Sequence, residues 1–463
     1  MRKFIISLAA LLLLFSCNKP AVPEVFSDFA SSVHVTSTDN ALRFAVELDI
    51  QKSASYRIWY WKEADGEASA QVTNVYEGAP GKEQHILKFL YPDTPYVFKV
   101  EVGEGVFSEN YSFTTGTIPP EVPVYHVLLN EGGPSEGFLM QWQASNPGYL
   151  TFCDMEGKVV WYQVFDQQVR HVYFAPDRGE IAILTGFREG VGSKQFQRLC
   201  DKIKLIDLDG NTLIDWVASE DNVPYPHHDI KIMPDGNLIF FNAALKEFDL
   251  TSIGGEDHVT VWGDGFTILD RTGKVVKSWD LFGAIDPVRD NDYLNTLTYY
   301  YDLVHGNSVS WDSEGNFYIT LNRLSELWKI DGKTGDVLWR YGAHGNLAFD
   351  GEWPVGGLHS SVPLAPNRVL CYNNGGGTDP CSRAQIYRVE GNTAIREMDV
   401  MVASEYSSKD RSNVELLPDG KTLMFASTLA RKCVFTDLEG KPLKVISRTG
   451  IAYRSHWFPS ISY

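Results

Sequence analysis

The chain has 463 residues, of which 44% are hydrophobic and 13% aromatic, so it is longer than one ordinary domain and can bury a large core. Lysine and arginine together number 41 against 59 aspartates and glutamates, and the resulting net charge of -18 opposes binding to the phosphate backbone of nucleic acids. We therefore expect no nucleic-acid partner.

The chain begins with a predicted lipoprotein signal peptide, residues 1–17. Arg2 and Lys3 precede an apolar run that ends near Phe15 and is shorter than the about 20 apolar residues of a membrane-spanning helix. The sequence Leu-Phe-Ser-Cys at its end resembles a bacterial lipobox, which implies a lipid on Cys17. A plain secretory signal is the alternative. We expect an exported protein anchored to a bacterial membrane, with the outer membrane favoured and its periplasmic or surface side left open.

The next segment, residues 27–116, alternates apolar and polar residues as β-strands do, for instance over 42–48 and 56–61. Residues 90–100 resemble the tyrosine-corner strand of a fibronectin type III sandwich, in which a Tyr hydroxyl pins the connection between the sheets. We expect a small β-sandwich of this kind without a catalytic site. The proline-rich stretch 118–123 then reads as a stiff linker.

Residues 119–463 repeat one motif, an Asp-containing turn with Gly that leads into an apolar strand often ending in Trp. The turn glycines are Gly157, Gly210, Gly273, Gly335, Gly391 and Gly440. Their spacing, roughly 50 to 60 residues, is the length of a four-stranded blade, so the sequence predicts an all-β fold with a six-bladed β-propeller after the sandwich. The repeated tryptophans are expected to pack between blades; they are Trp161, Trp216, Trp279 and Trp339.

Five cysteines follow Cys17, an odd number for an exported protein, so at least one stays a free thiol. Cys371 and Cys381 bracket the turn-rich residues 373–377. A disulfide between them and buried thiols in strands are both open, because spacing does not fix the Cα separation that a disulfide needs.

Three histidines, His227, His305 and His359, share one register, each seven residues before a turn. Equal offsets from equivalent turns place side chains at equivalent ends of equivalent strands, so we expect the three imidazoles to converge. The register favours His227 over the adjacent His228. Three other histidines lack this context; they are His171, His344 and His456.

Two more polar residues attach to the middle histidine. Asn307 is two residues beyond His305, the period that returns a strand side chain to the same face. Arg323 ends the strand 317–321, which a hairpin brings back beside His305. An Arg, an Asn and three His around one cavity suit a tetrahedral oxyanion, because guanidinium and imidazole groups both donate hydrogen bonds to such oxygens. Asp229 either orients an imidazole or caps a strand.

The ordered motifs resemble those of the bacterial arylsulfate sulfotransferases that need no nucleotide donor. The similar stretches are 305–309, 322–342 and 227–230 with the following turn 234–237. The resemblance covers roughly residues 125–463, and an N-terminal β-sandwich is also a feature of that family.

The resemblance implies a ping-pong transfer of a sulfuryl group from an aryl sulfate to a histidine and then to a phenol. By order, His359 corresponds to the nucleophile. The residues that hold the sulfuryl oxygens correspond to His227, His305, Asn307 and Arg323, with His228 as a further substrate-binding residue. A protonated His227 or His305 would serve the leaving oxygen, and the choice between them is open. No metal, nucleotide or other cofactor is implied. Oligomeric state, including a homodimer, stays open.

Two other classes of function remain alternatives. Three imidazoles suit a zinc-dependent lyase or hydrolase, although a cationic Arg323 beside a dication is unfavourable. A surface lipoprotein that binds a glycan or a protein without chemistry is the second. Loops such as 281–302 set the acceptor in the similar family, and they identify no natural donor or acceptor here.

Overall fold

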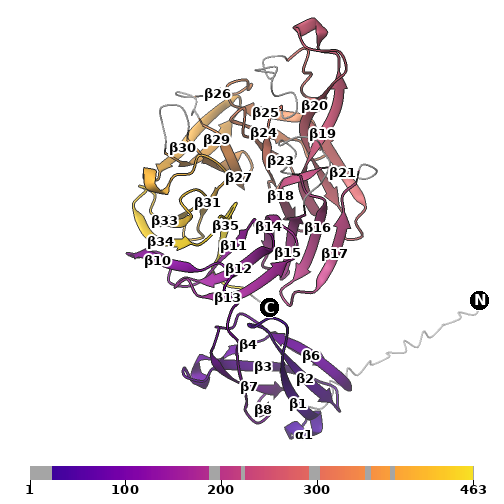
Figure 1. Cartoon of the computed structure of the whole chain (residues 1–463), viewed down its shortest axis with the longest axis vertical. Coiled ribbons are helices and arrows are strands. Elements are labelled where there is room, and N and C mark those ends of the chain that lie inside the picture. The colour runs from indigo at the N-terminus through magenta and orange to yellow at the C-terminus, as the bar shows by residue number, and fades with distance from the viewer. Residues whose placement is uncertain are drawn as a thin grey trace, which may run out of the picture. The chain divides into compact units, whose positions relative to one another are not determined.

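The computed structural model describes residues 23–186, 199–219, 225–290, 303–349, 356–375 and 381–461. The predicted signal peptide and Cys17 lie outside the described residues. Nearly all regular structure is β-strand, which confirms the all-β prediction (Figure 1). The described helices are short, and none has the length and apolar character needed to cross a membrane.

The chain forms two compact units. Unit 1 holds Phe44–Leu87 and Asp93–Thr115 together with the chain up to Asp39, and unit 2 holds Asn40–Arg43, Lys88–Pro92 and Gly116–Tyr463.

Unit 1 is built from two β-sheets. The first pairs β1 (Ala30–Ser37), β2 (Phe44–Ile50) and β6 (Gly81–Leu87). The second orders β4 (Gln71–Val72), β3 (Ala54–Lys62), β7 (Pro95–Val102) and β8 (Val106–Phe107), with β5 (Tyr76–Gly78) paired to β3 and β9 (Tyr111–Thr114) paired to β7. Short helices α1 (Phe26–Phe29) and η1 (Glu67–Ser69) complete the unit. Alternate residues of β3 are buried, and the ring of Tyr96 stacks on Phe113 at 5.5 Å between centroids, so aromatic side chains form much of this core.

Unit 2 contains, within the described ranges, six sheets of four or five strands that follow one another along the chain (Figure 1). Three consist of consecutive strands: β14 (Val169–Ala175), β15 (Glu180–Thr185), β16 (Lys202–Asp207), β17 (Thr212–Val217); β18 (Pro226–Ile232), β19 (Leu238–Phe248), β20 (Val259–Leu269), β21 (Val275–Asp280); and β22 (Gly306–Trp311), β23 (Phe317–Leu321), β24 (Glu326–Ile330), β25 (Val337–Tyr341). A fourth orders β27 (Leu358–Ala365), β28 (Arg368–Asn373), β29 (Arg383–Glu390), β30 (Thr393–Met401) and β26 (Ala348–Phe349). Short helices η3 (Thr251–Ile253), η4 (Leu281–Gly283) and η6 (Ser404–Tyr406) lie between strands.

The other two sheets join the beginning of unit 2 to its end. In one, β10 (Tyr125–Asn130) pairs with β34 (Pro442–Arg448), followed by β33 (Lys432–Thr436), β32 (Leu423–Ser427) and β31 (Asn413–Leu416). In the other, β13 (Val159–Phe165), β12 (Gly148–Asp154) and β11 (Phe138–Gln143) are completed by β35 (Ser455–Phe458). The six sheets of unit 2 are arranged in a circle (Figure 1), which is closed by hydrogen bonds between strands far apart in the sequence.

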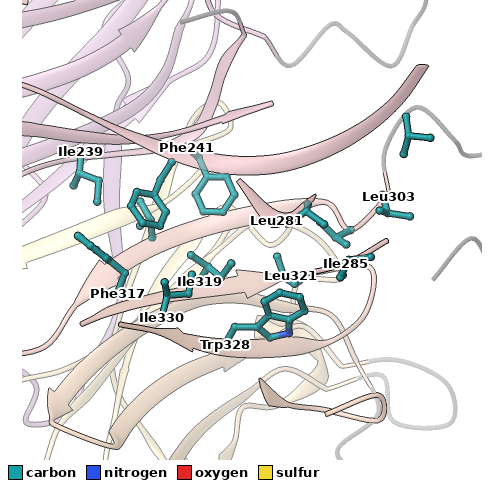
Figure 2. Packing of buried hydrophobic residues seen from close by; sticks show 14 of the residues in the cluster. Ile239, Phe241, Leu281, Ile285, Leu303, Phe317, Ile319, Leu321, Trp328 and Ile330 are labelled. Atoms are coloured by element: carbon teal, nitrogen blue, oxygen red, sulfur yellow. The ribbon is translucent and has the colours of Figure 1, made fainter. Parts of the chain in front are cut away.

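Apolar side chains fill the space between successive sheets. Figure 2 shows one such layer, in which Phe241 of β19 faces Ile319 of β23 and Trp328 of β24. Every residue of β23 is buried, as expected for a strand covered on both faces. Burying one such large side chain contributes about 1.5–3 kcal/mol, so these layers supply most of the stability of the unit.

The repeated tryptophans link neighbouring sheets as predicted. The indole nitrogen of Trp161 donates to the carbonyl of Leu208 at 2.9 Å, and that of Trp279 donates to the carbonyl of Gly335 at 2.8 Å. Both acceptors lie in the Asp-Gly turns of the next sheet. Gly335 adopts a φ of 82°, a left-handed conformation that favours glycine.

The five described cysteines form no disulfide with one another, so the disulfide considered between Cys371 and Cys381 is absent. Cys371 is fully buried in β28, and burial raises the pKa of its thiol to about 12. A buried thiol of this kind packs as a small apolar side chain and is unreactive.

Candidate functional site

Three imidazoles line one cavity of about 430 Å³ in unit 2, and they belong to His228, His305 and His359. The His228 and His305 rings lie 5.1 Å apart between centroids, and the His359 ring lies 5.6 Å from that of Tyr453. Further polar residues line the same cavity: Gln168, Arg170, Asn322, Lys409, Asp410, Arg411 and Tyr453. The convergence of three histidines on one cavity is therefore present, with His228 in the place predicted for His227.

Irregular pairing at one end of four strands positions these side chains. The register of β14 shifts between Val169 and His171, and that of β18 between His227 and Ile230. Equivalent shifts occur at Gly306–Ser308 of β22 and Leu358–Ser360 of β27. A bulge leaves a residue outside the ladder and re-aims its side chain. Three of the residues at these shifts line the cavity: Arg170, His228 and His359.

Left-handed backbone also concentrates at the cavity. His228 has a φ of 56°, His305 of 53° and Arg411 of 54°. Residues other than glycine pay for this conformation, and such strain is kept where the surrounding structure enforces it, often at functional sites. These segments therefore depart from regular strand geometry, and this departure fixes where their side chains lie.

His359 is the most deeply placed of the three imidazoles, with 5% of its surface exposed. Burial lowers the pKa of His359 well below its ordinary value, and the positive charges of Arg454 and Arg411 and the neighbouring imidazole of His305 add to this effect. Its Nδ1 atom is buried without a hydrogen-bond partner among the described residues. His359 is therefore held as neutral imidazole, the form that carries a nucleophilic lone pair.

His227 lies behind His228 instead of on the cavity. Its Nδ1 atom is 2.7 Å from Nδ1 of His228, and its Nε2 atom is 3.1 Å from Oδ1 of Asp264. The seven-residue register assigned His227 to the cavity, and the placement differs because the bulge in β18 turns the next residue inward.

Asn307 also lies away from the cavity lining. Its amide nitrogen donates to the carbonyl of Leu358 at 3.1 Å, and its amide oxygen accepts from Thr320 Oγ1 at 2.6 Å. The two-residue period from His305 does not hold, because the register shifts between Gly306 and Ser308. Asn307 thus ties β22 to its neighbours β23 and β27.

Arg323 follows the strand that returns beside His305, as predicted. The backbone nitrogen of Asn322 donates to the carbonyl of His305 at 3.0 Å, and that of Arg323 donates to Val304 at 3.2 Å. The side chain of Asn322 lines the cavity, whereas that of Arg323 is exposed and is not part of the lining. Among the residues that the structure describes, the arginines that line the cavity are Arg170 and Arg411.

A buried ion pair joins the strands beneath the cavity. Arg454 is 3% exposed; its guanidinium lies 3.2 Å from Oδ1 of Asp229 and donates to the carbonyls of Asn307 at 2.7 Å and His359 at 2.9 Å. Oδ2 of Asp229 accepts from the backbone of Val309, and Nε2 of His171 lies 2.8 Å from its Oδ1. Of the two roles open for Asp229, its contact with Nε2 of His171 fits that of orienting an imidazole, and His171 is not among the described residues that line the cavity.

The groups of this buried network shift one another's pKa values. Burial alone would raise the pKa of Asp229, but the nearby Lys231, Arg454 and His171 outweigh it and hold that pKa well below the ordinary value. Burial lowers the pKa of His171 to about 4, so its imidazole is neutral at physiological pH.

Sequence reasoning missed several of these residues for a common reason. Arg411 and Tyr453 stand in loops outside any repeated motif, and only the closed circle of sheets brings them to the cavity. Arg454 directly precedes β35, the strand that completes the β11 sheet, and no repeated motif marks it in the sequence.

Two further observations limit the choice of site. Among the described residues, no group of three His, Cys, Asp or Glu side chains is arranged to hold a metal ion. A larger cavity of about 520 Å³ also opens in unit 2, but it contains none of the histidines predicted for the site.

Comparison with solved structures finds remote similarity. A protein of unknown function from Bacteroides caccae is 15% identical, with a TM-score of 0.44 over 70% of this chain and 100% of that one. The periplasmic gluconolactonase PpgL of Pseudomonas aeruginosa is 12% identical, with a TM-score of 0.41 over 70% and 99%. The Myceliophteria thermophila Cps50 (Swd1) β-propeller domain is 11% identical, with a TM-score of 0.40 over 73% and 87%.

Comparison with sequence families identifies the family of this chain, which the remote structural similarity does not. Curated proteins give no significant match to this chain. The model of the arylsulfotransferase (ASST) family matches residues 130–445, well over half of the chain and the whole stretch that contributes His228, His305 and His359. The sequence motifs and this match agree, and the chain belongs to the arylsulfotransferase family.

Proposed function

We propose that this protein transfers a sulfuryl group from an aryl sulfate to a phenol through a sulfohistidine formed on His359. The observation that carries the proposal is the convergence of three imidazoles on one cavity, with the innermost, His359, buried and neutral. Family membership supplies the class of substrate. The proposal requires neither a nucleotide donor nor a metal.

In the first half-reaction, the lone pair of a His359 ring nitrogen attacks the sulfur atom. The bond between sulfur and the aryl oxygen breaks, and its electron pair leaves with the aryl oxide. A neutral imidazole is a competent nucleophile near neutral pH, and a covalent intermediate divides one difficult displacement into two easier ones. The second half-reaction reverses the step, with the oxygen of an acceptor phenol attacking sulfur and His359 leaving.

Negative charge on the sulfuryl oxygens needs fixed donors in both steps. His305 and Arg411 line the cavity beside His359 and can provide them. Removal of one such donor typically costs about 3 kcal/mol of transition-state stabilisation. The family resemblance assigns the same task to Arg323, and we retain that assignment as a proposal, to be tested by Arg323→Gln beside Arg411→Gln.

The test is release of 4-nitrophenol from 4-nitrophenyl sulfate by the purified protein, with and without added phenol, beside His359→Ala. We expect rapid release that depends on phenol and on His359, with phenyl sulfate as the second product. A ³⁵S-labelled donor without acceptor should label the wild-type chain and leave His359→Ala unlabelled.

Three other outcomes would each favour a different function. Release that is equally fast without phenol would make the protein a sulfatase, and activity lost on chelation would favour a metal-dependent hydrolase. Absence of both release and labelling over a panel of aryl sulfates would favour the binding lipoprotein.

We also infer the setting in which this chemistry occurs. The six sheets are assigned as the blades of a six-bladed propeller, unit 1 as a fibronectin-III-like sandwich, and Cys17 as the lipidated residue of an exported lipoprotein. Radiolabelled palmitate incorporated into the wild type and absent from Cys17→Ala would support the anchor, and equal labelling of both would refute it.

A further inference from the structure

The contact between His227 and Asp264 continues a chain of groups that starts at the cavity. His228 lines the cavity, its Nδ1 atom lies 2.7 Å from Nδ1 of His227, and Nε2 of His227 lies 3.1 Å from a carboxylate oxygen of Asp264. His227 is 1% and Asp264 is 2% exposed. Two imidazoles and a carboxylate therefore extend in series from the cavity into the interior.

The interior end of this series is enclosed by apolar rings. The ring of His227 lies 5.7 Å from that of Phe241 and 5.9 Å from that of Trp262. A carboxylate in such surroundings is costly unless a positive charge or strong donors face it. Asp264 has two facing groups, His227 and the backbone nitrogen of Gly306, which donates to its other oxygen.

Glycine at position 306 leaves room for the carboxylate of Asp264. A Cβ atom on Gly306 would lie 2.3 Å from the ring of Phe241 and 3.0 Å from Oδ2 of Asp264. Glycine at position 306 is therefore what lets the carboxylate approach the backbone next to His305. Asp264 thus supports two of the three cavity histidines, His228 through His227 and His305 through the adjacent amide.

We propose that Asp264, His227 and His228 form a proton relay, in which His228 exchanges a proton with the phenolic oxygen and Asp264 and His227 act as positioning residues behind it. This inference rests on the proposed sulfuryl transfer. It places the acid–base function, which the sequence left between His227 and His305, on His228 with His227 in support.

The relay balances the protons of both half-reactions. When the bond between sulfur and the aryl oxygen breaks, His228 gives a proton to the departing oxide, and His227 replaces it through the short contact between the Nδ1 atoms. The pair is then neutral. When the acceptor phenol attacks sulfohistidine, His228 takes the phenol proton and the pair again carries one positive charge beside Asp264. No oxidant, metal or further reactant is consumed.

The geometry favours a stored charge over a simple hydrogen bond. The carboxylate oxygen of Asp264 lies within ion-pair distance of Nε2 of His227 but off the direction of a straight hydrogen bond. Such a contact acts mainly through charge, because a carboxylate favours a positive charge on the group that it faces. This is the property that a proton store between half-reactions needs.

The test compares Asp264→Asn with the wild type on two donors, 4-nitrophenyl sulfate and phenyl sulfate. Nitrophenolate is a weak base and leaves without a proton, whereas phenolate needs one. General acid catalysis contributes about 100-fold or more. We expect kcat/KM for phenyl sulfate to fall about 100-fold and that for 4-nitrophenyl sulfate to fall less than about five-fold. His227→Gln should show the same split if Asp264→Asn does not fold.

A matched control separates the relay from a structural role. Asp312 is 5% exposed and pairs with Lys329 at 3.1 Å outside the cavity, so Asp312→Asn should affect the two donors equally. Equal losses on both donors in Asp264→Asn would overturn the relay. Wild-type protein inactive on both donors would instead refute the proposed function.

A second measurement is independent of activity. In ¹⁵N NMR of labelled histidine, the ring signals of His227 and His228 should move in Asp264→Asn and stay in place in Asp312→Asn, because only the first change removes the carboxylate beside the pair. Unmoved signals in Asp264→Asn would overturn the relay even in an active enzyme.

Discussion

At the scale of single residues, the chemistry proposed here depends on a histidine that stays neutral. Burial, the positive charges of Arg454 and Arg411, and the neighbouring imidazole of His305 all lower the pKa of His359. A lowered pKa keeps the neutral form present to lower pH, so activity should persist below pH 6.5, near the ordinary pKa of histidine. The acid limb of kcat/KM for 4-nitrophenyl sulfate is therefore expected below that value.

Arg411→Gln should move this limb in a defined direction. Loss of the positive charge makes protonated His359 less unfavourable, so the pKa of His359 rises and the acid limb shifts to higher pH. We expect this move to higher pH together with a lower kcat from the lost oxyanion donor. A full pH profile of the variant and the wild type measures both effects.

Arg431→Gln is the matched control for this comparison. Arg431 is exposed and has a φ of 53°, close to the 54° of Arg411, but it does not line the cavity. Its replacement carries the same backbone cost without the change in charge at His359. An acid limb that stays in place in Arg411→Gln, or that moves equally in both variants, would contradict the account of His359.

At the scale of strands, one arginine fixes the arrangement of the inner strands. Arg454 bonds to Asp229 of β18, to the carbonyl of Asn307 in β22 and to that of His359 in β27. Arg454→Lys keeps the charge but cannot reproduce the planar set of donors, so bonds to these carbonyls are lost. We expect the free energy of unfolding to fall by about 1–3 kcal/mol and kcat to fall at least ten-fold.

Arg448→Lys tests whether the loss of activity is specific. Arg448 is also buried, at 7% exposure, and its guanidinium donates to the carbonyl of Ser427 at 3.2 Å, away from the cavity. Urea unfolding should show a comparable loss of stability with unchanged kcat. If both variants lose activity in proportion to stability, Arg454 has no particular role in placing His359.

The strands also explain which parts of the site the sequence could predict. The turn motifs and their spacing predicted the successive sheets. The indole nitrogens of Trp161 and Trp279 donate hydrogen bonds to turns of the neighbouring sheets, as expected. Equal spacing before the turns identified His305 and His359 correctly as residues of one cavity. These predictions depend on regular strands, whose period is fixed by the backbone.

Prediction failed where the strands are irregular. A bulge in β18 exchanges the roles expected for His227 and His228, and a bulge in β22 turns Asn307 away from His305. Bulges leave little trace in a single sequence, because most residue types can occupy them. Asp264 carried no signal at all, since it contacts His227 only through the pairing of β18, β19 and β20.

At the scale of the whole molecule, the site forms only when the circle of sheets in unit 2 is closed. β35 comes from the end of the chain and pairs with β11, and this pairing brings Tyr453 and Arg454 to the cavity and its buried network. Opening of the circle of sheets on unfolding should therefore abolish catalysis at the same time.

Acid should open this circle through His171 of β14, which is 1% exposed and contacts Asp229 at 2.8 Å. Its pKa is about 4 in the folded state, against about 6.5 in an unfolded chain. Between these values the unfolded state binds more protons, so stability falls as pH decreases. His171 alone should account for about 2 kcal/mol between pH 7 and pH 5.

In His171→Gln this part of the loss should vanish, whereas replacement of the exposed His126 should leave it intact. Urea unfolding at the two pH values decides the matter: an equal loss in wild type and His171→Gln would mean that the neutral imidazole beside Asp229 is not what makes the closed circle acid-sensitive.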